Sequence, residues 1–165
     1  MAAFAMPPIA AILHTRNDGL RLGRALESLR VCDEIVIFDH GSTDQTLRVA
    51  REYGAKVIPI SPTQDWRHAI SPEHCRWLLL VQPSEAISEG LEAALYEWKL
   101  RSEAAVAHVT SCLVSLREEI HEGWSTPSPI TRLIPKNWQL WEGNLPQHDP
   151  QGMTLDGDLL RFHQP

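Results

Sequence analysis

Short apolar runs alternate with amphipathic stretches over the first part of the chain. The runs at 9–14, 34–38, 56–60 and 77–81 have the length and composition of buried strands. Apolar residues at helical spacing predict one helix over about 20–30 and a second helix that ends at Tyr53. A third helix is predicted after Ser88, with Leu91, Ala94, Leu95 and Trp98 on one face.

Local signals mark the ends of these elements. Ser42 and Gln45 have the spacing of a capping box, in which a hydroxyl and an amide satisfy free backbone N–H groups at a helix start. Gly54 suits the position just after the second helix, because glycine readily adopts the left-handed conformation found there. Pro59 has no backbone donor, so the third strand is expected near the edge of its sheet.

These elements follow one another in the order β-α-β-α-β. That order predicts parallel strands joined by right-handed crossovers. Ligands of such sheets bind beyond the carboxyl ends of the strands. The turns at 15–18 and 39–42 are therefore expected side by side on one rim.

The last third of the chain has a different sequence pattern, with strand signals and no clear helix. Residues 105–116 have the pattern of a long strand, and 130–134, 139–141 and 159–163 of short ones. We expect loops and antiparallel strands that pack on the front sheet. No repeat, low-complexity tract or clean linker divides the 165 residues, so one domain is predicted.

Composition narrows the class of protein. A net charge of −6 without Lys/Arg clusters argues against a nucleic-acid partner. Cys32, Cys75 and Cys112 are odd in number and form no CxxC, which favours free thiols in a reducing compartment. The start of the chain lacks a basic region, so it is not interpreted as a signal peptide. No apolar run approaches the ~20 residues of a membrane span, and a cytoplasmic protein is expected.

The first sixty or so residues resemble family 2 glycosyltransferases, which have the GT-A fold. That family opens with a strand and a PTYNE-like turn, which here is HTRND at 14–18. A strand of the type EIVVVDDGSTD follows a leucine-striped helix, and here it is EIVIFDHGSTD at 34–44. Weaker similarity covers 77–85, and a segment at 132–147 resembles lipopolysaccharide-core glucosyltransferases.

The resemblance implies a single GT-A-like (Rossmann-like) α/β domain over 1–165. Its central sheet would be mostly parallel, with a smaller antiparallel C-terminal part. About 1–100 would form the nucleotide-binding half and about 101–165 the acceptor-side half. The implied partner is a nucleotide sugar, a UDP-sugar-like donor, and the oligomeric state stays open.

The resemblance also assigns residues to the nucleotide end. Asp39 matches the aspartate that contacts the base or ribose, although it could instead cap its own turn. The opening turn lines the base pocket in the family, but its polar side chains could equally cap the first helix. Gly41 and Ser42 are expected to shape the second turn. The complete predicted set at this end is Thr15, Asn17, Asp18, Asp39, Gly41 and Ser42.

The chemistry depends on 82–85, where the family has a DxD motif that holds Mg²⁺ or Mn²⁺ against the diphosphate. Here the two acids align with Gln82 and Ser84, which complete the residues expected to bind the nucleotide sugar, and Glu85 is the carboxylate that remains. A neutral amide and hydroxyl are weak ligands for a hard cation. We therefore predict no protein-held metal site, with Mg²⁺ or Mn²⁺ left as a cofactor that a bound nucleotide sugar could bring. The alternative is a plain turn in which Ser84 or Ser88 caps the next helix.

A second departure falls where the family has a VHE-like motif. Gln147 occupies the position of the acid that would deprotonate the acceptor hydroxyl, and glutamine cannot take up a proton. His148 and Asp149 follow directly and could substitute. The candidate catalytic residues are accordingly Glu85, Gln147 and His148.

Three functions are compatible with these observations. The chain is either a glycosyltransferase, with weak activity included, or a non-catalytic GT-A-like binding or scaffold domain. The third is a doubly wound nucleotide-binding or regulatory domain without sugar specificity. The similarity at 9–60 favours the first two, while the substitutions at Gln82, Ser84 and Gln147 favour the second over the first.

Overall fold

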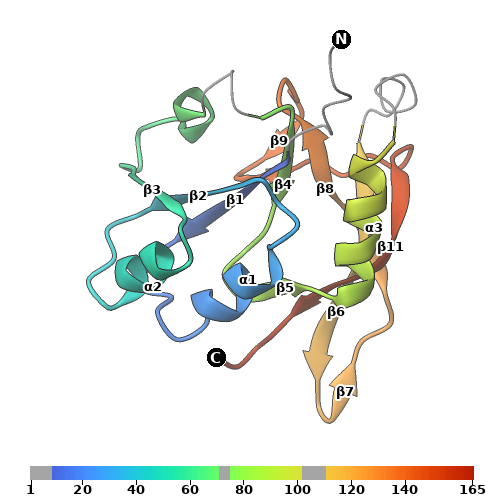
Figure 1. The fold of residues 1–165 in the computed structure, drawn as a ribbon, viewed down its shortest axis with the longest axis horizontal. Coiled ribbons are helices and arrows are strands. Elements are labelled where there is room, and N and C mark those ends of the chain that lie inside the picture. Colours follow the sequence, from blue (N-terminus) through green and yellow to red (C-terminus); the bar gives the residue numbers. More distant parts are fainter. Residues whose placement is uncertain (1–8, 71–74, 102–110) are drawn as a thin grey trace.

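The structure is a computed structural model that describes residues 9–70, 75–101 and 111–165. It is a mixed α/β domain built on one large, curled sheet, with few helices (Figure 1). The front strands are β1 (Ile9–Thr15), β2 (Glu34–Asp39), β3 (Lys56–Pro59) and β4 (Trp77–Leu80). The helices are α1 (Leu22–Ser28), α2 (Thr46–Glu52), the 3-10 helix η1 (Trp66–Ala69) and α3 (Glu89–Lys99).

The four front strands lie in the order β3-β2-β1-β4, and all of their pairings are parallel. This confirms the predicted front sheet, and it places β3 at the edge as Pro59 indicated. β1 is buried on both faces, which explains its unbroken apolar run.

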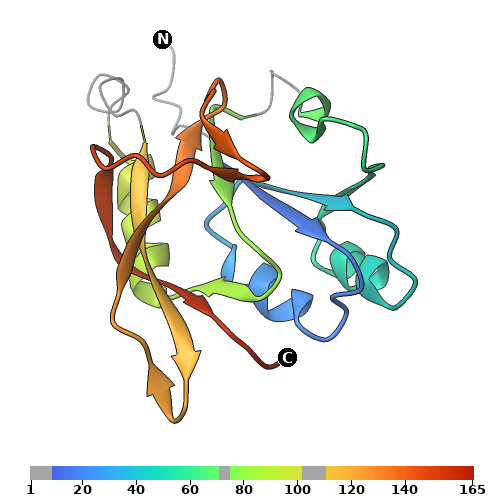
Figure 2. The same ribbon diagram turned by 180° about the vertical axis from the view of Figure 1, so that it is seen from behind.

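Most of the remaining described strands extend this sheet, whereas the expectation was that they would pack on it; only one short antiparallel pair among them lies on its face. β8 (Ser128–Pro135) pairs antiparallel with β4, and β6 (Cys112–Ile120) pairs with β8 (Figure 2). β11 (Met153–Arg161) lies parallel to β6, and β5 (Glu85–Ile87) closes the order. A short strand, β7 (Gly123–Trp124), pairs with β6, while β9 (Trp141–Glu142) and β10 (Leu145–Pro146) form a separate antiparallel pair. The part of the long predicted strand at 105–110 lies outside the described residues.

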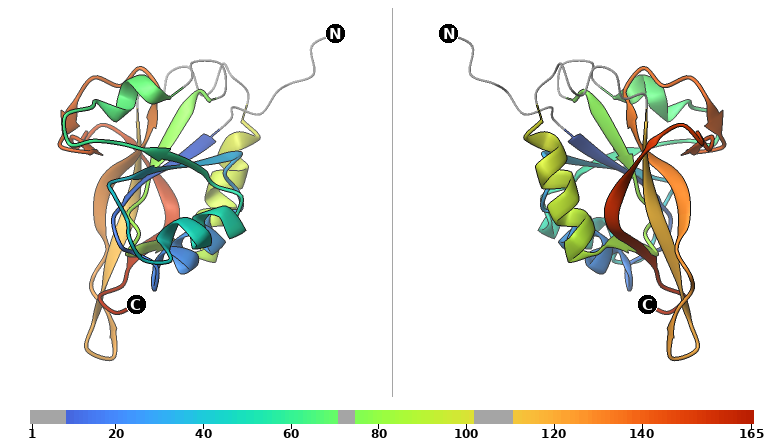
Figure 3. Two further views of the ribbon diagram at one scale, coloured as in Figure 1. Left: turned by 90° about the vertical axis from the view of Figure 1, so that its left-hand side faces the viewer. Right: turned by 90° about the vertical axis from the view of Figure 1, so that its right-hand side faces the viewer.

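Two apolar clusters lie on opposite faces of the sheet. The face covered by α1, α2 and α3 buries alternate residues of β1, among them Ile9, Ala11 and Leu13. The other face buries Ala10 and Ile12 under η1 and the β9–β10 pair. Figure 3 shows the three α-helices gathered on one side. Two consecutive right-handed crossovers that step in the same direction place α1 and α2 on the same face.

The ends of the helices follow local sequence in two of three cases. Gly54 has φ +73° just after α2, as predicted. Ser88 caps α3, because its Oγ accepts from Leu91 N at 3.1 Å. The capping box was wrong: α2 begins after Gln45, whose side chain makes no capping bond. Ser42 Oγ instead accepts from the backbone N–H of Asn17 at 3.0 Å.

Candidate functional site

The two predicted turns meet at the carboxyl ends of β1 and β2. Thr15 and Asp39 are register partners on neighbouring strands. Asn17 has φ +54°, and its Oδ1 accepts from Thr43 N at 2.8 Å. Together with the bond from Asn17 N to Ser42, this contact joins the turns, and the expected shared rim is confirmed.

Asp39 shapes its own turn. Its carboxylate is buried and accepts from the backbone N–H groups of Gly41 and Ser42 at 3.2–3.3 Å. Gly41 has φ +87°, a conformation that favours glycine. The turn-capping alternative is thus what this structure contains, and contact of Asp39 with a nucleotide stays a prediction.

Asp18 is the most heavily engaged residue of the opening turn. Its Oδ2 accepts from Thr15 Oγ1 at 2.7 Å and from Arg16 N at 3.1 Å. Its Oδ1 accepts from Arg21 Nε at 2.8 Å. The backbone N–H of Asp18 donates to Thr46 Oγ1, so this turn is also tied to α2.

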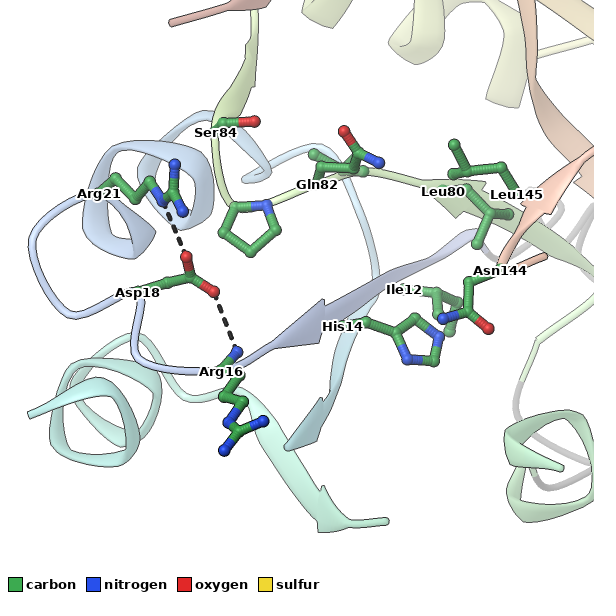
Figure 4. Close-up of a pocket in the computed structure, with 12 residues that line it drawn as sticks. Ile12, His14, Arg16, Asp18, Arg21, Leu80, Gln82, Ser84, Asn144 and Leu145 are labelled. Carbon is green, nitrogen blue, oxygen red and sulfur yellow. Dashed lines mark hydrogen bonds and ion pairs between the residues drawn. The ribbon is translucent and has the colours of Figure 1, made fainter. Parts of the chain in front are cut away.

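A pocket of about 380 Å³ opens beside this rim, between the carboxyl ends of β1 and β4 (Figure 4). Arg16, Asp18 and Arg21 lie at one end of it, and Asn144 and Leu145 at the other. Its walls are completed by Ile12, His14, Leu80, Val81, Gln82, Pro83 and Ser84. Of the predicted site residues, Asp18, Gln82 and Ser84 therefore line this pocket.

The segment from Gln82 to Glu85 forms a tight turn at the end of β4. Glu85 N donates to Gln82 O at 2.9 Å, and Gln82 N donates back to Glu85 Oε1 at 2.8 Å. Ser84 O accepts from Phe162 N at 2.8 Å. The amide of Gln82 and the hydroxyl of Ser84 are thereby held at the pocket wall as neutral hydrogen-bonding groups.

Glu85 does not line this pocket. Its side chain is fully buried and accepts two hydrogen bonds from Arg132, at 2.8 and 2.9 Å. Arg161 donates to the same carboxylate at 2.9 Å. The carboxylate that sequence reasoning had placed in the catalytic set therefore accepts hydrogen bonds from two guanidinium groups and from the backbone N–H of Gln82.

These contacts bear on the metal that the family would hold here. Asp18 and Glu85 are both paired with arginines, and the DxD positions are neutral. Within 9–70, 75–101 and 111–165, no group of three or more His, Cys, Asp or Glu side chains is arranged to hold a metal ion. The residues present do not fit a divalent cation bound in the family's manner.

His14 is the titratable side chain of the pocket with the strongest perturbation. Its Nδ1 lies 2.9 Å from Nε2 of His40, and its ring stacks on Phe38. Burial, then the neighbouring His40 and Arg67, lowers the pKa of His14 from 6.5 to about 4. The imidazole is therefore neutral at neutral pH and serves as a hydrogen-bonding group.

Gln147 and His148 lie in the segment after β10 and are exposed to solvent. Gln147 N donates to Leu140 O at 2.9 Å. Asp149 is used structurally, since it accepts from Ser111 Oγ at 2.8 Å. Neither Gln147 nor His148 lines the pocket described above, and their catalytic roles stay predictions.

Sequence reasoning missed several pocket residues. Asn144 comes from the β9–β10 turn, and its Oδ1 accepts from Trp66 Nε1 at 3.1 Å, which ties the turn to η1. Ile12 and His14 share one face of β1, a relationship that the period of two in a strand could have revealed. Arg16 belongs to the turn at 14–18, but its position at the pocket follows from the fold and not from the local sequence.

Comparison with known proteins now adds to this geometry. An uncharacterized glycosyltransferase of Rickettsia felis is 32% identical over 92 residues, which make up 53% of this chain and 32% of that protein. A TPR repeat-containing protein of Synechococcus elongatus is 30% identical over 166 residues, 97% of this chain and 38% of that protein. The chain thus spans about a third of the length of these curated relatives. No protein-family model matches it.

Similarity to a solved structure concerns the fold. The crystal structure of TarS from S. aureus superposes with a TM-score of 0.51 at 22% identity, over 70% of this chain and 23% of TarS. At that identity the likeness shows the fold, which is GT-A. The chain therefore has a GT-A fold and is similar in sequence to glycosyltransferases, as the resemblance of its first sixty residues implied.

None of the described helices is long and apolar enough to cross a membrane. A cytoplasmic location stays a prediction.

Proposed function

We propose that the chain binds a nucleotide sugar at the rim formed by Thr15 and Asp39, with the diphosphate and sugar in the adjoining pocket. The observation that carries this proposal is the junction of the two turns beside a pocket between β1 and β4. Open α/β sheets bind ligands at this edge. The names of the relatives add the expectation that the ligand carries a sugar.

Transfer would break the bond between the anomeric carbon and the diphosphate oxygen and form a bond to an acceptor oxygen. The hydroxyl proton of the acceptor must then leave. Gln147 cannot accept it, whereas the exposed imidazole of His148 can. His148 is accordingly the candidate base of this proposal. A structure with a bound acceptor would test whether His148 comes close enough to the pocket to accept the proton.

A second function, binding without catalysis, has its own support. The carboxylate of Glu85 is enclosed by Arg132 and Arg161, so it cannot act on a ligand in this arrangement. The domain would then bind a nucleotide sugar without transferring the sugar, or it would serve as a scaffold for another protein segment.

Titration of the glucose conjugates of UDP, GDP and TDP, with and without Mn²⁺, separates these functions. Binding of one conjugate together with release of its free nucleoside diphosphate supports the transferase. Binding without release, across sugar and lipid-linked acceptors, supports the binding domain. Absence of binding for all three at millimolar concentration would reject both.

A further inference from the structure

The pocket combines two arginines with no unpaired carboxylate. Asp18 already accepts hydrogen bonds on both oxygens, from Thr15, Arg16 N and Arg21. Opposite it stand the neutral side chains of Gln82 and Ser84. With His14 neutral, the charged side chains among the described residues of the lining are one aspartate and two arginines, a net charge of +1.

The two guanidinium groups differ in how they are held. Arg21 is anchored through its Nε to Asp18 at 2.8 Å, while the side chain stays 43% exposed. Its two terminal nitrogens make no hydrogen bond within the described part of the chain. Arg16 is exposed, and its guanidinium has no partner among the described residues. Both therefore have donors to offer to a ligand.

We propose that this pocket neutralises the diphosphate of its ligand with Arg16 and Arg21 and requires no divalent cation. The inference rests on the proposed function and specifies how the same site would recognise the phosphates. Guanidinium groups present planar, paired donors that match phosphate oxygens, and charge-assisted bonds of this kind are stronger than neutral ones. The amide of Gln82 and the hydroxyl of Ser84 would add neutral donors where a metal-binding site needs anionic ligands.

The arrangement also disfavours a cation directly. A metal ion that entered with the ligand would meet the Asp18 carboxylate already paired with Arg21, and Glu85, which does not line the pocket, is paired with Arg132. It would also approach the positive charge of Arg16. Since one site cannot favour both signs of charge equally, the lining that suits a bare diphosphate opposes Mg²⁺ or Mn²⁺.

Calorimetry with UDP and uridine, in excess EDTA and in saturating MnCl₂, tests this inference. We expect the Kd of UDP to agree within about twofold between the two conditions. The double variant Arg16→Gln/Arg21→Gln should weaken UDP by roughly tenfold or more and leave uridine unchanged, because uridine has no phosphate to contact. Arg48→Gln, which removes an exposed arginine of α2, is the matched control and should change neither ligand.

The single variant Arg16→Gln controls for a folding defect, because the Arg16 side chain has no partner to lose among the residues that the structure describes. It should retain the melting temperature and still weaken UDP. UDP binding that requires Mn²⁺ would overturn the inference and leave the proposed function standing, as would UDP binding in EDTA that is indifferent to both arginines. If neither UDP nor uridine binds in any condition, the inference and the proposed function fail together.

Discussion

Arg132 and Glu85 meet through two parallel hydrogen bonds, Nη1 to Oε1 at 2.8 Å and Nη2 to Oε2 at 2.9 Å. The Arg132 side chain is 3% exposed and that of Glu85 is fully buried. Arg132 also donates to Leu80 O, and Glu85 accepts from Gln82 N. This one pair therefore links β8, the end of β4 and the turn that forms a wall of the pocket.

Loss of the Glu85 charge should destabilise the domain strongly. Glu85→Gln leaves Arg132 buried without its counter-ion, and breaking one side of a buried pair costs about 3–5 kcal/mol. Urea denaturation of the variant and the wild type at neutral pH measures the difference in free energy of unfolding.

Glu118→Gln is the matched control for that variant. Glu118 also pairs with Arg161, at 2.8 Å, but its side chain is 43% exposed. Solvent screens such a pair, so the expected loss is about 1 kcal/mol or less. Equal destabilisation by the two variants would mean that burial of Glu85 does not set its contribution.

The front of the fold was predictable because its signals are local. Buried parallel strands give unbroken apolar runs, and Gly54 and Ser88 mark the helix ends by their own chemistry. The back of the sheet was not predictable in the same way. The pairing of β8 between β4 and β6 joins segments far apart in the chain, and propensity does not report such partners.

The same contrast between local signals and long-range contacts applies to the candidate site. The shared rim followed from the rule that parallel strands end at one edge. Ser42 was assigned to the wrong helix cap because its true donor, Asn17 N, lies 25 residues away. The burial of Glu85 depends on Arg132 and Arg161, each of which comes from the back of the sheet, so no local pattern around Glu85 reveals it.

A second prediction concerns the close approach of β11 to α3. Gly157 has φ +86°, and a Cβ placed on it would lie 2.0 Å from Leu91 N. Since backbone atoms cannot move aside cheaply, Gly157→Ala should lower the free energy of unfolding by roughly 2–5 kcal/mol. Gly143→Ala is the control, because Gly143 has φ +63° with open space around it and should lose only about 1 kcal/mol. Thermal melting that ranks the two variants equally would contradict the contact.

The third prediction is a dependence of stability on pH through His14. Its pKa is lowered to about 4 in the folded chain, against 6.5 when it is free, so the unfolded state binds the proton more readily between these values. The contribution of His14 to the free energy of unfolding is therefore complete above pH 6.5. It is lost as the pH falls toward 4, by on the order of 2–3 kcal/mol. Urea denaturation at pH 7 and pH 5 should show a smaller decrease in the free energy of unfolding for His14→Gln than for the wild type. Identical losses would show that His14 does not carry the effect.

The fourth prediction tests the nucleotide end of the rim. Asp39→Ala should weaken a nucleoside diphosphate by about 1–3 kcal/mol, since it removes an acceptor for the ligand and frees the N–H groups of Gly41 and Ser42. Asp156→Ala removes an exposed carboxylate from β11 and should leave binding unchanged. Calorimetry with UDP compares the two variants, and an equal effect of both would remove Asp39 from the site.

The last prediction restores acids at the pocket wall. Gln82→Asp combined with Ser84→Asp returns two carboxylates to the positions where the family holds its metal, on a wall that already faces the pocket. Mn²⁺ and Mg²⁺ favour anionic oxygen ligands, so the double variant should bind Mn²⁺ roughly tenfold or more tightly than the wild type, provided that Pro83 permits the required turn.

Gln82→Asn with Ser84→Asn is the control for shape, because it resembles the acidic pair in size and adds no charge. Paramagnetic broadening by Mn²⁺ in the absence of nucleotide gives the affinities of all three proteins. The acidic pair also adds negative charge to the pocket that Arg16 and Arg21 line, so UDP should bind to it more weakly in EDTA, and the affinity should recover when Mn²⁺ is added. Mn²⁺ binding by the wild type as tight as by the acidic variant would show that Gln82 and Ser84 do not decide the metal requirement, and that the cation is held by groups other than the carboxylates of this wall.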